Sequence, residues 1–392
     1  MRRTAVLLCL LGLLAGAAVP SGAQEPPALP DNPLAGRLLF ERKSCVLCHG
    51  IAGEVHGTGP DLGRGAFSGS FLDLGAGLWN HVPGMSVSLE DARLPWPELS
   101  AREVGSLTAF LYFIDYLGRP GEAAAGRRVF ASEGCAECHS LEGGRGGSAP
   151  DLAGLTRFAS PLFIAQAIWN HGPAMFETMR AAGVATPDFA AGDLADLSAF
   201  VRQTARGGPQ ERMLVAPGNP NRGRELFRDR GCPLCHGRDA RGDGGPDLTR
   251  ADLHRSAEAI AGSMWNHAEA MSDAMRARGL GWPEFTTPEL ADLIAFLYFL
   301  PFADPPGDAA RGAEVFASRS CAECHGGGEA AHEGPDLAAS GVAGTHADFV
   351  AAMWNHAPLM KESILGEGRP WPELSGDDLR DILAYLGSES TR

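Results

Sequence analysis

The sequence predicts an all-α protein of four tandem domains, arranged as two duplicated two-domain modules. One set of short motifs recurs four times along the chain, and each repeat spans about 85 to 95 residues. Apolar residues at helical spacing open and close every repeat, and no alternating strand pattern recurs. Glycine accounts for 51 of the 392 residues, which is near twice its ordinary usage and indicates long loops between the helices.

The first 23 residues have the features of a secretory signal peptide. Arg2 and Arg3 precede an apolar run from Ala5 to about Val19, and small residues stand at the expected cleavage position before Gln24. The alternative is a retained membrane anchor, but the run is shorter than the ~20 residues that a span needs. We therefore expect cleavage after Ala23 and a periplasmic or otherwise exported protein, with no transmembrane segment in the mature chain.

The mature chain is acidic. Without the leader, 31 basic residues face 48 acidic ones, so the net charge is near −17. This balance disfavours nucleic acid and anionic membrane surfaces as partners, and it favours solubility and basic partners. A surface that is merely well solvated is equally compatible with it.

All eight cysteines of the mature chain fall in four C-x-x-C-H units, and none is left over. The units are Cys45, Cys48 and His49; Cys135, Cys138 and His139; Cys232, Cys235 and His236; and Cys321, Cys324 and His325. A disulfide framework does not call for a histidine after every second cysteine, so these thiols have another use.

Three chemistries use such a cysteine pair. A structural zinc site needs two further ligands, usually a second pair in the same small domain, and each repeat has only one pair. A redox dithiol of the thioredoxin type follows a strand in a βαβ pattern, which is absent here. Covalent haem attachment uses both thiols for the two vinyl groups and the adjacent histidine for the iron, so the sequence favours haem in all four repeats.

The remaining motifs keep a fixed order around each unit. A glycine stands nine residues before the first cysteine and a phenylalanine five before it; P-D-L and W-N-H follow, and a methionine stands four residues after the W-N-H histidine. The opening segments match between repeats 1 and 3 and between repeats 2 and 4, and the cysteines of matching repeats are 187 and 186 residues apart. We expect tight packing within each module, repeats 1 with 2 and 3 with 4, and a looser relation between modules.

The predicted domain limits follow from these motifs. They are a signal peptide at 1–23, domains at 32–118 and 119–206, a Pro/Gly/Asn-rich linker at 207–220, and domains at 221–303 and 304–388. The closing segments are the clearest helices. Ser100 with Glu103 forms a capping-box pattern, Ser375 with Asp378 imitates one, and Thr287 precedes a proline at a helix start.

This order of features resembles the class I c-type cytochromes, repeated four times across essentially the whole mature chain. The resemblance implies four covalent haem c groups, and it implies that the glycine and aromatic of each first helix meet an aromatic of the last helix. The implied sets are Gly36 and Phe40 with Phe110; Gly126 and Phe130 with Phe200; Gly223 and Phe227 with Phe296; and Gly312 and Phe316 with Tyr385. It also implies that a carbonyl beside the P-D-L proline accepts the second N–H of the proximal histidine, with Pro60, Pro150, Pro246 and Pro335 in that place.

The sixth iron ligand is less clear, because the sequence departs from the family there. The family usually supplies a methionine from a loop shortly before the last helix, where this chain has W-P-E or T-P-D. The favoured candidates are Met85, Met175, Met271 and Met360. The alternative candidates are His81, His171, His267 and His356. Proline two residues after the histidine in three repeats suggests that one helix ends there and another begins, which would place the methionine in a new turn.

Two groups of residues receive other expectations. The W-N-H tryptophans are expected to pack on the haem edge or to bond a haem propionate through the indole N–H: Trp79, Trp169, Trp265 and Trp354. Four histidines without counterparts across repeats are expected at the surface: His56, His254, His332 and His346.

The resulting functional hypothesis is an exported tetrahaem cytochrome that carries single electrons between redox partner proteins and has no catalytic residues of its own. The alternatives are a peroxidase-like haem enzyme and the cytochrome subunit of a periplasmic dehydrogenase. An enzyme needs a haem whose sixth ligand is labile or missing, but all four repeats keep both candidate ligands. Repeat 2, with Thr186-Pro187-Asp188, is a mild outlier.

Overall fold

The computed structural model describes residues 33–51, 57–63, 69–114, 116, 118–141, 149–153, 160–204, 218–249, 256–326, 334–342 and 344–390. Within these ranges the chain is helical and contains no β-strand, which confirms the all-α prediction. None of the helices in the described part is long and apolar enough to cross a membrane. The predicted signal peptide and most of the predicted linker lie outside the described residues.

Every repeat has the same order of elements: a first helix, a short helical turn at C-x-x-C-H, a middle helix and a last helix. The first helices are α1 (Pro33–Arg42), α5 (Ala123–Ser132), α9 (Pro220–Asp229) and α13 (Ala309–Ser318). The turns are the 3₁₀-helix η1 (Cys45–Leu47), α6 (Cys135–Cys138), α10 (Pro233–His236) and α14 (Cys321–His325). The middle helices are α2 (Phe71–Asn80) with α3 (Val82–Asp91), α7 (Pro161–Ala182), α11 (Ala257–Ala277) and α15 (His346–Gly366). The last helices are α4 (Ala101–Phe113), α8 (Asp193–Gln203), α12 (Thr287–Phe299) and α16 (Gly376–Glu389), and the 3₁₀-helix η4 (Leu300–Phe302) follows α12.

The first and last helices of each repeat cross at the expected glycine and aromatic pair. The ring centroids are 5.7 Å apart for Phe40 and Phe110, and the other three pairs lie at 5.3 to 5.7 Å. A Cβ atom added at Gly36 would stand 2.0 Å from the Ser106 carbonyl oxygen, and the same holds within 0.1 Å for the other three glycines. Only glycine permits this approach of the two helices, so the implied packing is confirmed.

The last helices begin where their capping residues stand. Ser100 and Glu103 form a capping box at α4, and Ser375 and Asp378 form one at α16. In repeat 3 the N-cap is Thr286, one residue before the predicted start, because its hydroxyl accepts from the Glu289 N–H.

The expected helix break after the W-N-H histidine occurs in one repeat only. In repeat 1, α2 ends at Asn80 and α3 begins at Val82, with Pro83 in its first turn. In repeats 2 and 4 the prediction is wrong, because α7 and α15 continue through Pro173 and Pro358. The helices tolerate these prolines because the carbonyls that they leave without an intrahelical partner are used elsewhere, as described below.

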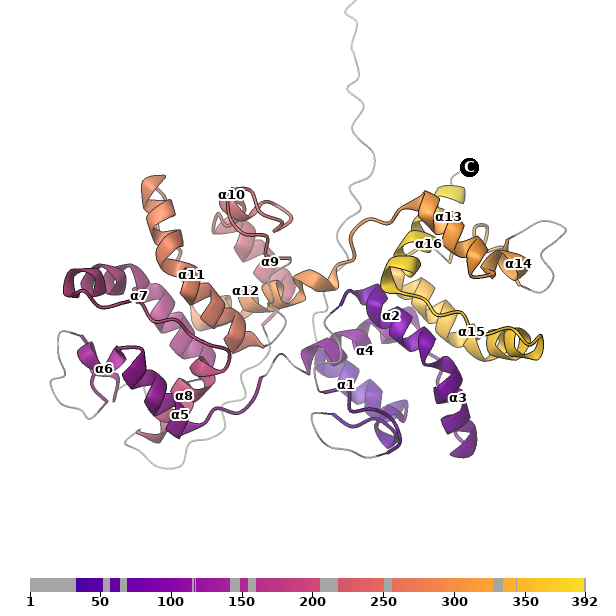
Figure 1. Ribbon diagram of the computed structural model, residues 1–392, viewed down its shortest axis with the longest axis horizontal. Coiled ribbons are helices and arrows are strands. Elements are labelled where there is room, and N and C mark those ends of the chain that lie inside the picture. The colour runs from indigo at the N-terminus through magenta and orange to yellow at the C-terminus, as the bar shows by residue number, and fades with distance from the viewer. Residues whose placement is uncertain are drawn as a thin grey trace, which may run out of the picture.

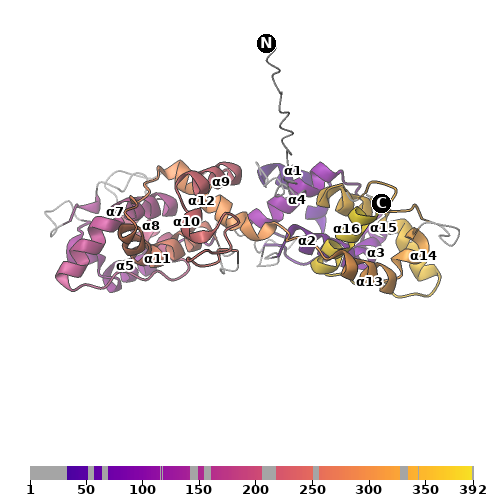
Figure 2. The ribbon, with the colours of Figure 1, turned by 90° about the horizontal axis from the view of Figure 1, so that it is seen from above.

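The prediction that neighbouring repeats pair within a module is also wrong. The main helix contacts between repeats join α15 to α2, α3 and α4, join α16 to α2, and join α11 and α12 to repeat 2. Repeat 1 therefore pairs with repeat 4, and repeat 2 with repeat 3, as the two lobes of Figure 1 and Figure 2 show. The sequence duplication relates repeat 1 to 3 and repeat 2 to 4, so the two pairs are equivalent interfaces.

Aromatic side chains join the two lobes at the C-terminal ends of α4 and α12. The Tyr298 hydroxyl donates to the Tyr112 carbonyl, and the rings of Tyr116 and Tyr298 meet edge to face at 5.0 Å. Tyr112 also meets Phe302 edge to face at 5.1 Å. These contacts make repeats 1 and 3 the inner members of the molecule, and repeats 4 and 2 the outer ones.

Candidate haem sites

A left-handed residue turns the chain into each C-x-x-C-H unit. The residue before the first cysteine has φ between 62° and 81°: Ser44, Gly134, Gly231 and Ser320. The eight cysteines of these four units are free thiols and half-buried. Burial raises the pKa of the first thiol of each unit to about 11, so these groups stay protonated near neutral pH when unmodified. The described cysteines therefore form no disulfide and remain available for covalent attachment.

The histidine of each unit is oriented by the P-D-L loop. Nδ1 of His49 lies 3.1 Å from the Pro60 carbonyl oxygen, and the corresponding distances in repeats 2, 3 and 4 are 2.9, 3.1 and 3.0 Å. A glycine precedes the proline in repeats 1, 3 and 4, and a Cβ atom at Gly334 would stand 2.5 Å from the His325 ring, whereas repeat 2 has Ala149 at this position. With Nδ1 donating to a carbonyl, Nε2 carries the lone pair that a metal needs. The expected hydrogen bond is present in all four repeats, and the acceptor is the proline's own carbonyl.

The W-N-H tryptophans do not have the predicted role at a propionate. The Trp79 indole N–H donates to the Pro372 carbonyl in repeat 4 at 2.8 Å, and the Trp354 indole N–H donates to the Pro97 carbonyl in repeat 1. The same bonds join repeats 2 and 3, from Trp169 to Pro283 and from Trp265 to Pro187. All four indole N–H groups therefore donate to carbonyls of a partner repeat, and the predicted hydrogen bond to a haem propionate is wrong.

The W-N-H asparagines complete this interface. Asn80 accepts from the Leu374 N–H and donates to the Leu374 carbonyl, at 2.9 and 2.8 Å. Equivalent two-way pairs are Asn355 with Leu99, Asn170 with Phe285, and Asn266 with Phe189. The W-P-E or T-P-D segment, which carries no predicted ligand, is therefore the docking segment for the partner repeat. Sequence reasoning missed this role, although both motifs recur together.

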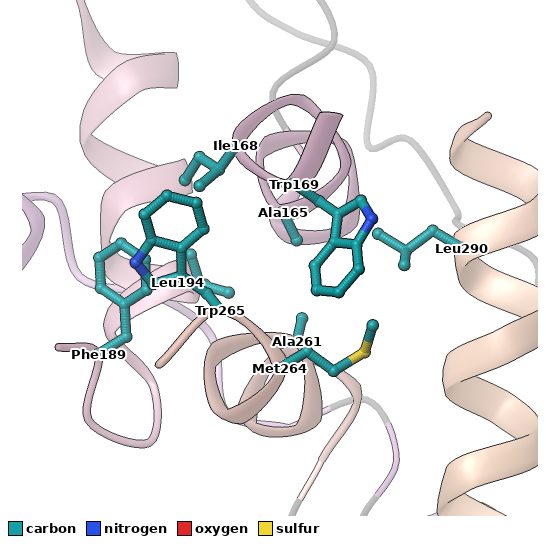
Figure 3. Close-up of a pocket in the computed structure, with 9 residues that line it drawn as sticks. All are labelled: Ala165, Ile168, Trp169, Phe189, Leu194, Ala261, Met264, Trp265 and Leu290. Atoms are coloured by element: carbon teal, nitrogen blue, oxygen red, sulfur yellow. The ribbon is translucent and has the colours of Figure 1, made fainter. Parts of the chain in front are cut away.

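Small residues allow the two middle helices to approach at these interfaces. In the 2/3 pair, Ala165 of α7 and Ala261 of α11 face each other between Trp169 and Trp265, as Figure 3 shows. The space that remains is an apolar void of about 10 Å³. It is too small and too apolar to be a ligand site, so the interface is closed by packing.

Besides the histidine of the C-x-x-C-H unit, each repeat has a second imidazole, that of the W-N-H histidine, and hydrogen bonds orient it in three repeats. Nδ1 of His81 lies 2.6 Å from the Gly77 carbonyl oxygen one turn back, and His171 and His356 make the same contact at 2.7 and 2.9 Å. In repeat 3, the ring centroids of His236 and His267 are 6.3 Å apart. Burial and the neighbouring His236 both lower the pKa of His267, which favours the neutral imidazole that binds metals.

The four candidate methionines lie one helical turn further along. Met85, Met175, Met271 and Met360 are partly buried and pack against the hydrophobic core. In repeats 2, 3 and 4 the histidine and the methionine belong to one uninterrupted helix, so the methionine is not in a loop. The structural reason for preferring methionine therefore holds for repeat 1 alone.

Repeat 4 shows that these groups surround one cavity. A cleft of about 1460 Å³ is lined by Cys321, Cys324 and His325 on one side and by His356 and Met360 on α15. Phe316 and Leu337 add apolar wall, and Trp79 reaches the cleft from repeat 1. Two thiols, oriented imidazoles and an apolar lining match the needs of a covalently attached haem, so the residues present fit that group.

The T-P-D segment of repeat 2, which replaces the W-P-E of the other repeats, contacts repeat 3. Where repeats 1, 3 and 4 have a tryptophan, the Thr186 hydroxyl donates to the Glu269 carboxylate of repeat 3 at 2.6 Å. Arg180 also pairs with Glu269 at 2.9 Å. The departure therefore reflects a different contact between repeats.

One of the four remaining histidines departs from its expected surface position. His346 is half-buried, with Nδ1 3.3 Å from the fully buried carboxylate of Asp304. That carboxylate also accepts from the Leu72 N–H of repeat 1, so the contact anchors the connection between repeats 3 and 4. The other three, His56, His254 and His332, lie outside the described residues.

Comparisons with known families agree with this reading. A family model described as cytochrome c matches residues 123–205 and 220–300, and a model described as cytochrome C oxidase, cbb3-type, subunit III matches residues 307–386. These matches fall in repeats 2, 3 and 4. Searches of curated proteins and of solved structures found no significant match.

Proposed function

The chain belongs to the c-type cytochromes, and on that premise we propose that it is an exported carrier of single electrons with four covalently bound haem c groups. Each haem would be held by the two cysteines of a C-x-x-C-H unit and by its histidine as proximal iron ligand. The observation that carries the proposal is the fourfold recurrence of this unit, each time with Nδ1 of the histidine on a proline carbonyl.

The bound iron would supply a reversible Fe(III)/Fe(II) couple, which needs no substrate-binding position. The chain's own residues hold that couple in place. The proline carbonyls fix the proximal imidazole rings and raise their basicity, and the W-N-H helix offers a sixth ligand, histidine or methionine, in every repeat. Because all four repeats keep these candidates, nothing in the sites favours an enzyme over a carrier.

The pairing of repeats supports an electron path that departs from chain order. Trp79 lies near the end of α2, two residues before the candidate ligand His81 of repeat 1, and its indole also lines the cavity of repeat 4. It stacks on Trp371 at 4.2 Å, so one aromatic pair lies between the two sites. We infer that electrons exchange within the 1/4 and 2/3 pairs, and pass between lobes through the inner repeats 1 and 3.

The acidic mature chain favours redox partners with a basic docking surface. Their attraction should weaken as ionic strength rises, because salt screens contacts between exposed charges.

Intact-mass measurement of the purified exported protein tests the haem count. We expect the mass of the chain from Gln24 onward plus four haems, and one haem fewer when Cys321 and Cys324 are both replaced by serine. A mature protein with fewer than four haems would refute the tetrahaem proposal. A mass that includes residues 1–23 would refute signal-peptide cleavage.

A further inference from the structure

We propose that the W-N-H histidines, His81, His171, His267 and His356, are the sixth ligands, so that two imidazoles hold each iron. This assignment rests on the proposed function, because it presupposes a haem in each repeat. It differs from the histidine and methionine pair that the resemblance to class I cytochromes implies. Three independent features of the described residues support this assignment.

The first feature is the distance between the two imidazole rings of repeat 3. A nitrogen ligand lies roughly 2.0 Å from its metal, and the centre of an imidazole ring lies a little over one ångström behind the nitrogen. Two imidazoles on opposite sides of one iron therefore have ring centres a little over 6 Å apart, by the same estimate. The centroids of His236 and His267 are 6.3 Å apart. The spacing is that of two ligands of one metal ion.

The second feature is the orientation of the W-N-H histidines in the other three repeats. The Gly77 carbonyl oxygen already accepts the backbone N–H of His81 at 3.2 Å, and it also receives Nδ1 of the same residue at 2.6 Å. This second bond makes Nδ1 the protonated nitrogen and leaves Nε2 with its lone pair. His171 and His356 repeat the contact. It is the same arrangement that the proline carbonyl imposes on the proximal histidines, and metal-binding histidines generally donate their other N–H in this way.

The third feature is the position of the methionines on the same helices. In α11, His267 and Met271 are one turn apart on the same face of an uninterrupted helix, so only one of them can occupy the axial position. The His267 ring already stands at ligand distance from the His236 ring, whereas Met271 packs against the core. Methionine is flexible and fills irregular apolar space well, which gives these four residues a role as pocket wall.

Two imidazoles set a lower reduction potential than imidazole with thioether, because methionine ligation raises the potential of haem iron. They also close both axial positions. The assignment therefore predicts four low-spin, low-potential haems and no carbon monoxide binding to the reduced wild-type protein.

The test uses the full-length holoprotein with single changes in repeat 3, read by low-temperature electron paramagnetic resonance, near-infrared absorption and redox titration. Met271→Leu should leave the axial signature and midpoint potential of all four haems unchanged. His267→Met should give one quarter of the haem a thioether signature and a raised potential. His267→Ala should make one quarter high-spin and bind one carbon monoxide per protein when reduced. If the alanine variant fails to fold, the other two variants decide the question.

The opposite pattern overturns the proposal. Thioether-ligated haem in the wild-type protein, or a high-spin quarter in Met271→Leu, would assign methionine. An unchanged spectrum in His267→Met would remove histidine from the site. The haem count by intact mass is read on the same samples. A count below four contradicts the tetrahaem function without deciding the ligand, which the spectra of the attached haems still report.

Discussion

The Trp371 indole N–H donates to the Trp79 carbonyl at 3.1 Å, and Pro83 is the reason that this carbonyl is available. In an α-helix, the carbonyl of residue 79 would accept the N–H of residue 83, but proline has none. The same relation holds twice more: Pro173 frees the Trp169 carbonyl for Trp282, and Pro358 frees the Trp354 carbonyl for Trp96. Each proline after W-N-H thus matches a tryptophan in the partner repeat.

Repeat 3 lacks the proline, and its partner repeat lacks the tryptophan, so the two residues are absent together. Glu269 stands where the other repeats have proline, and the partner repeat has Thr186 where the others have tryptophan. Glu269 keeps the N–H that a helix directs to the Trp265 carbonyl, so this carbonyl is not left without its helical partner as it is where proline stands. The two positions instead bond through their side chains at 2.6 Å.

A double substitution, Glu269→Pro with Thr186→Trp, should give the 2/3 pair the fourth contact between a tryptophan indole and a carbonyl left free by proline. Glu269→Pro alone should destabilise the 2/3 pair by about 3 kcal/mol, because it removes a helical hydrogen bond without supplying a partner for the carbonyl. Thr186→Trp alone should destabilise it by about 1 kcal/mol through the lost side-chain bond. The double variant should be more stable than the sum of the two changes, with a coupling of about 0.5–3 kcal/mol, measured as unfolding free energies from native-state hydrogen exchange.

The matched control for that cycle is Ala270→Pro with Thr186→Trp, since a proline at the exposed Ala270 of α11 removes the N–H directed to the Asn266 carbonyl and not the one directed to the Trp265 carbonyl. It should show no coupling. Additive effects in the Glu269→Pro cycle would mean that the proline and the tryptophan are unrelated.

Asparagine substitutions test which repeats are partners. Asn80→Ala should expose the Leu374 amide and carbonyl and weaken the 1/4 pair by about 1–3 kcal/mol, because both polar groups lose their partner. Hydrogen exchange should accelerate at Leu374. Asn266→Ala is the matched variant and should accelerate exchange at Phe189 instead. Accelerated exchange in repeat 2 on Asn80→Ala would favour pairing along the chain.

Two glycines of repeat 4 give opposite predictions. At Gly312 an added Cβ atom would stand 1.9 Å from the Asp381 carbonyl oxygen, so Gly312→Ala must push α13 and α16 apart and should cost about 1–3 kcal/mol or more. Gly387 lies inside α16 with nothing within 4 Å of an added Cβ atom, so Gly387→Ala should stabilise by about 0.5–1 kcal/mol. Denaturation of the holoprotein measures both, and equal effects would contradict the described helix crossing.

A buried carboxylate predicts acid sensitivity in repeat 2. Burial by itself would raise the pKa of Asp196, but the Arg119 guanidinium and the Glu122 N–H bond the carboxylate and lower that pKa overall. The stability from this group is therefore present above the unfolded-state pKa of about 3.9 and is lost as pH falls through the lower folded-state pKa. Arg119→Gln should raise the folded-state pKa, so unfolding of repeat 2 should begin at higher pH.

The control for the acid titration is Arg228→Gln, because Arg228 and Asp229 form an ion pair that is largely exposed. Circular dichroism across the acid range should show an onset like that of wild type. If Arg119→Gln also leaves the onset unchanged, the Arg119–Asp196 pair does not govern acid stability.

The sequence predicted what is encoded within one repeat. The family resemblance implied both the crossing of Gly36 and Phe40 with Phe110 and the hydrogen bond of His49 to the P-D-L loop. Both depend on residues close in the chain or on the order of motifs.

The pairing of repeats could not be predicted in the same way. Trp79 and Pro372 are 293 residues apart, and the acceptor is a backbone carbonyl, which no side-chain pattern identifies. The recurrence of W-N with W-P-E and the joint change to Glu269 and Thr186 were visible signals. These signals indicate a contact only when one considers that a proline in a helix leaves the carbonyl four residues earlier without its usual N–H donor.

A spectroscopic redox titration of the purified full-length holoprotein at low temperature is the most direct test of a tetrahaem electron carrier. The account predicts four haem equivalents that are reduced by one electron each, all six-coordinate and low-spin before and after reduction. Fewer than four equivalents, or one haem that stays five-coordinate and binds carbon monoxide stoichiometrically, would contradict a tetrahaem electron carrier.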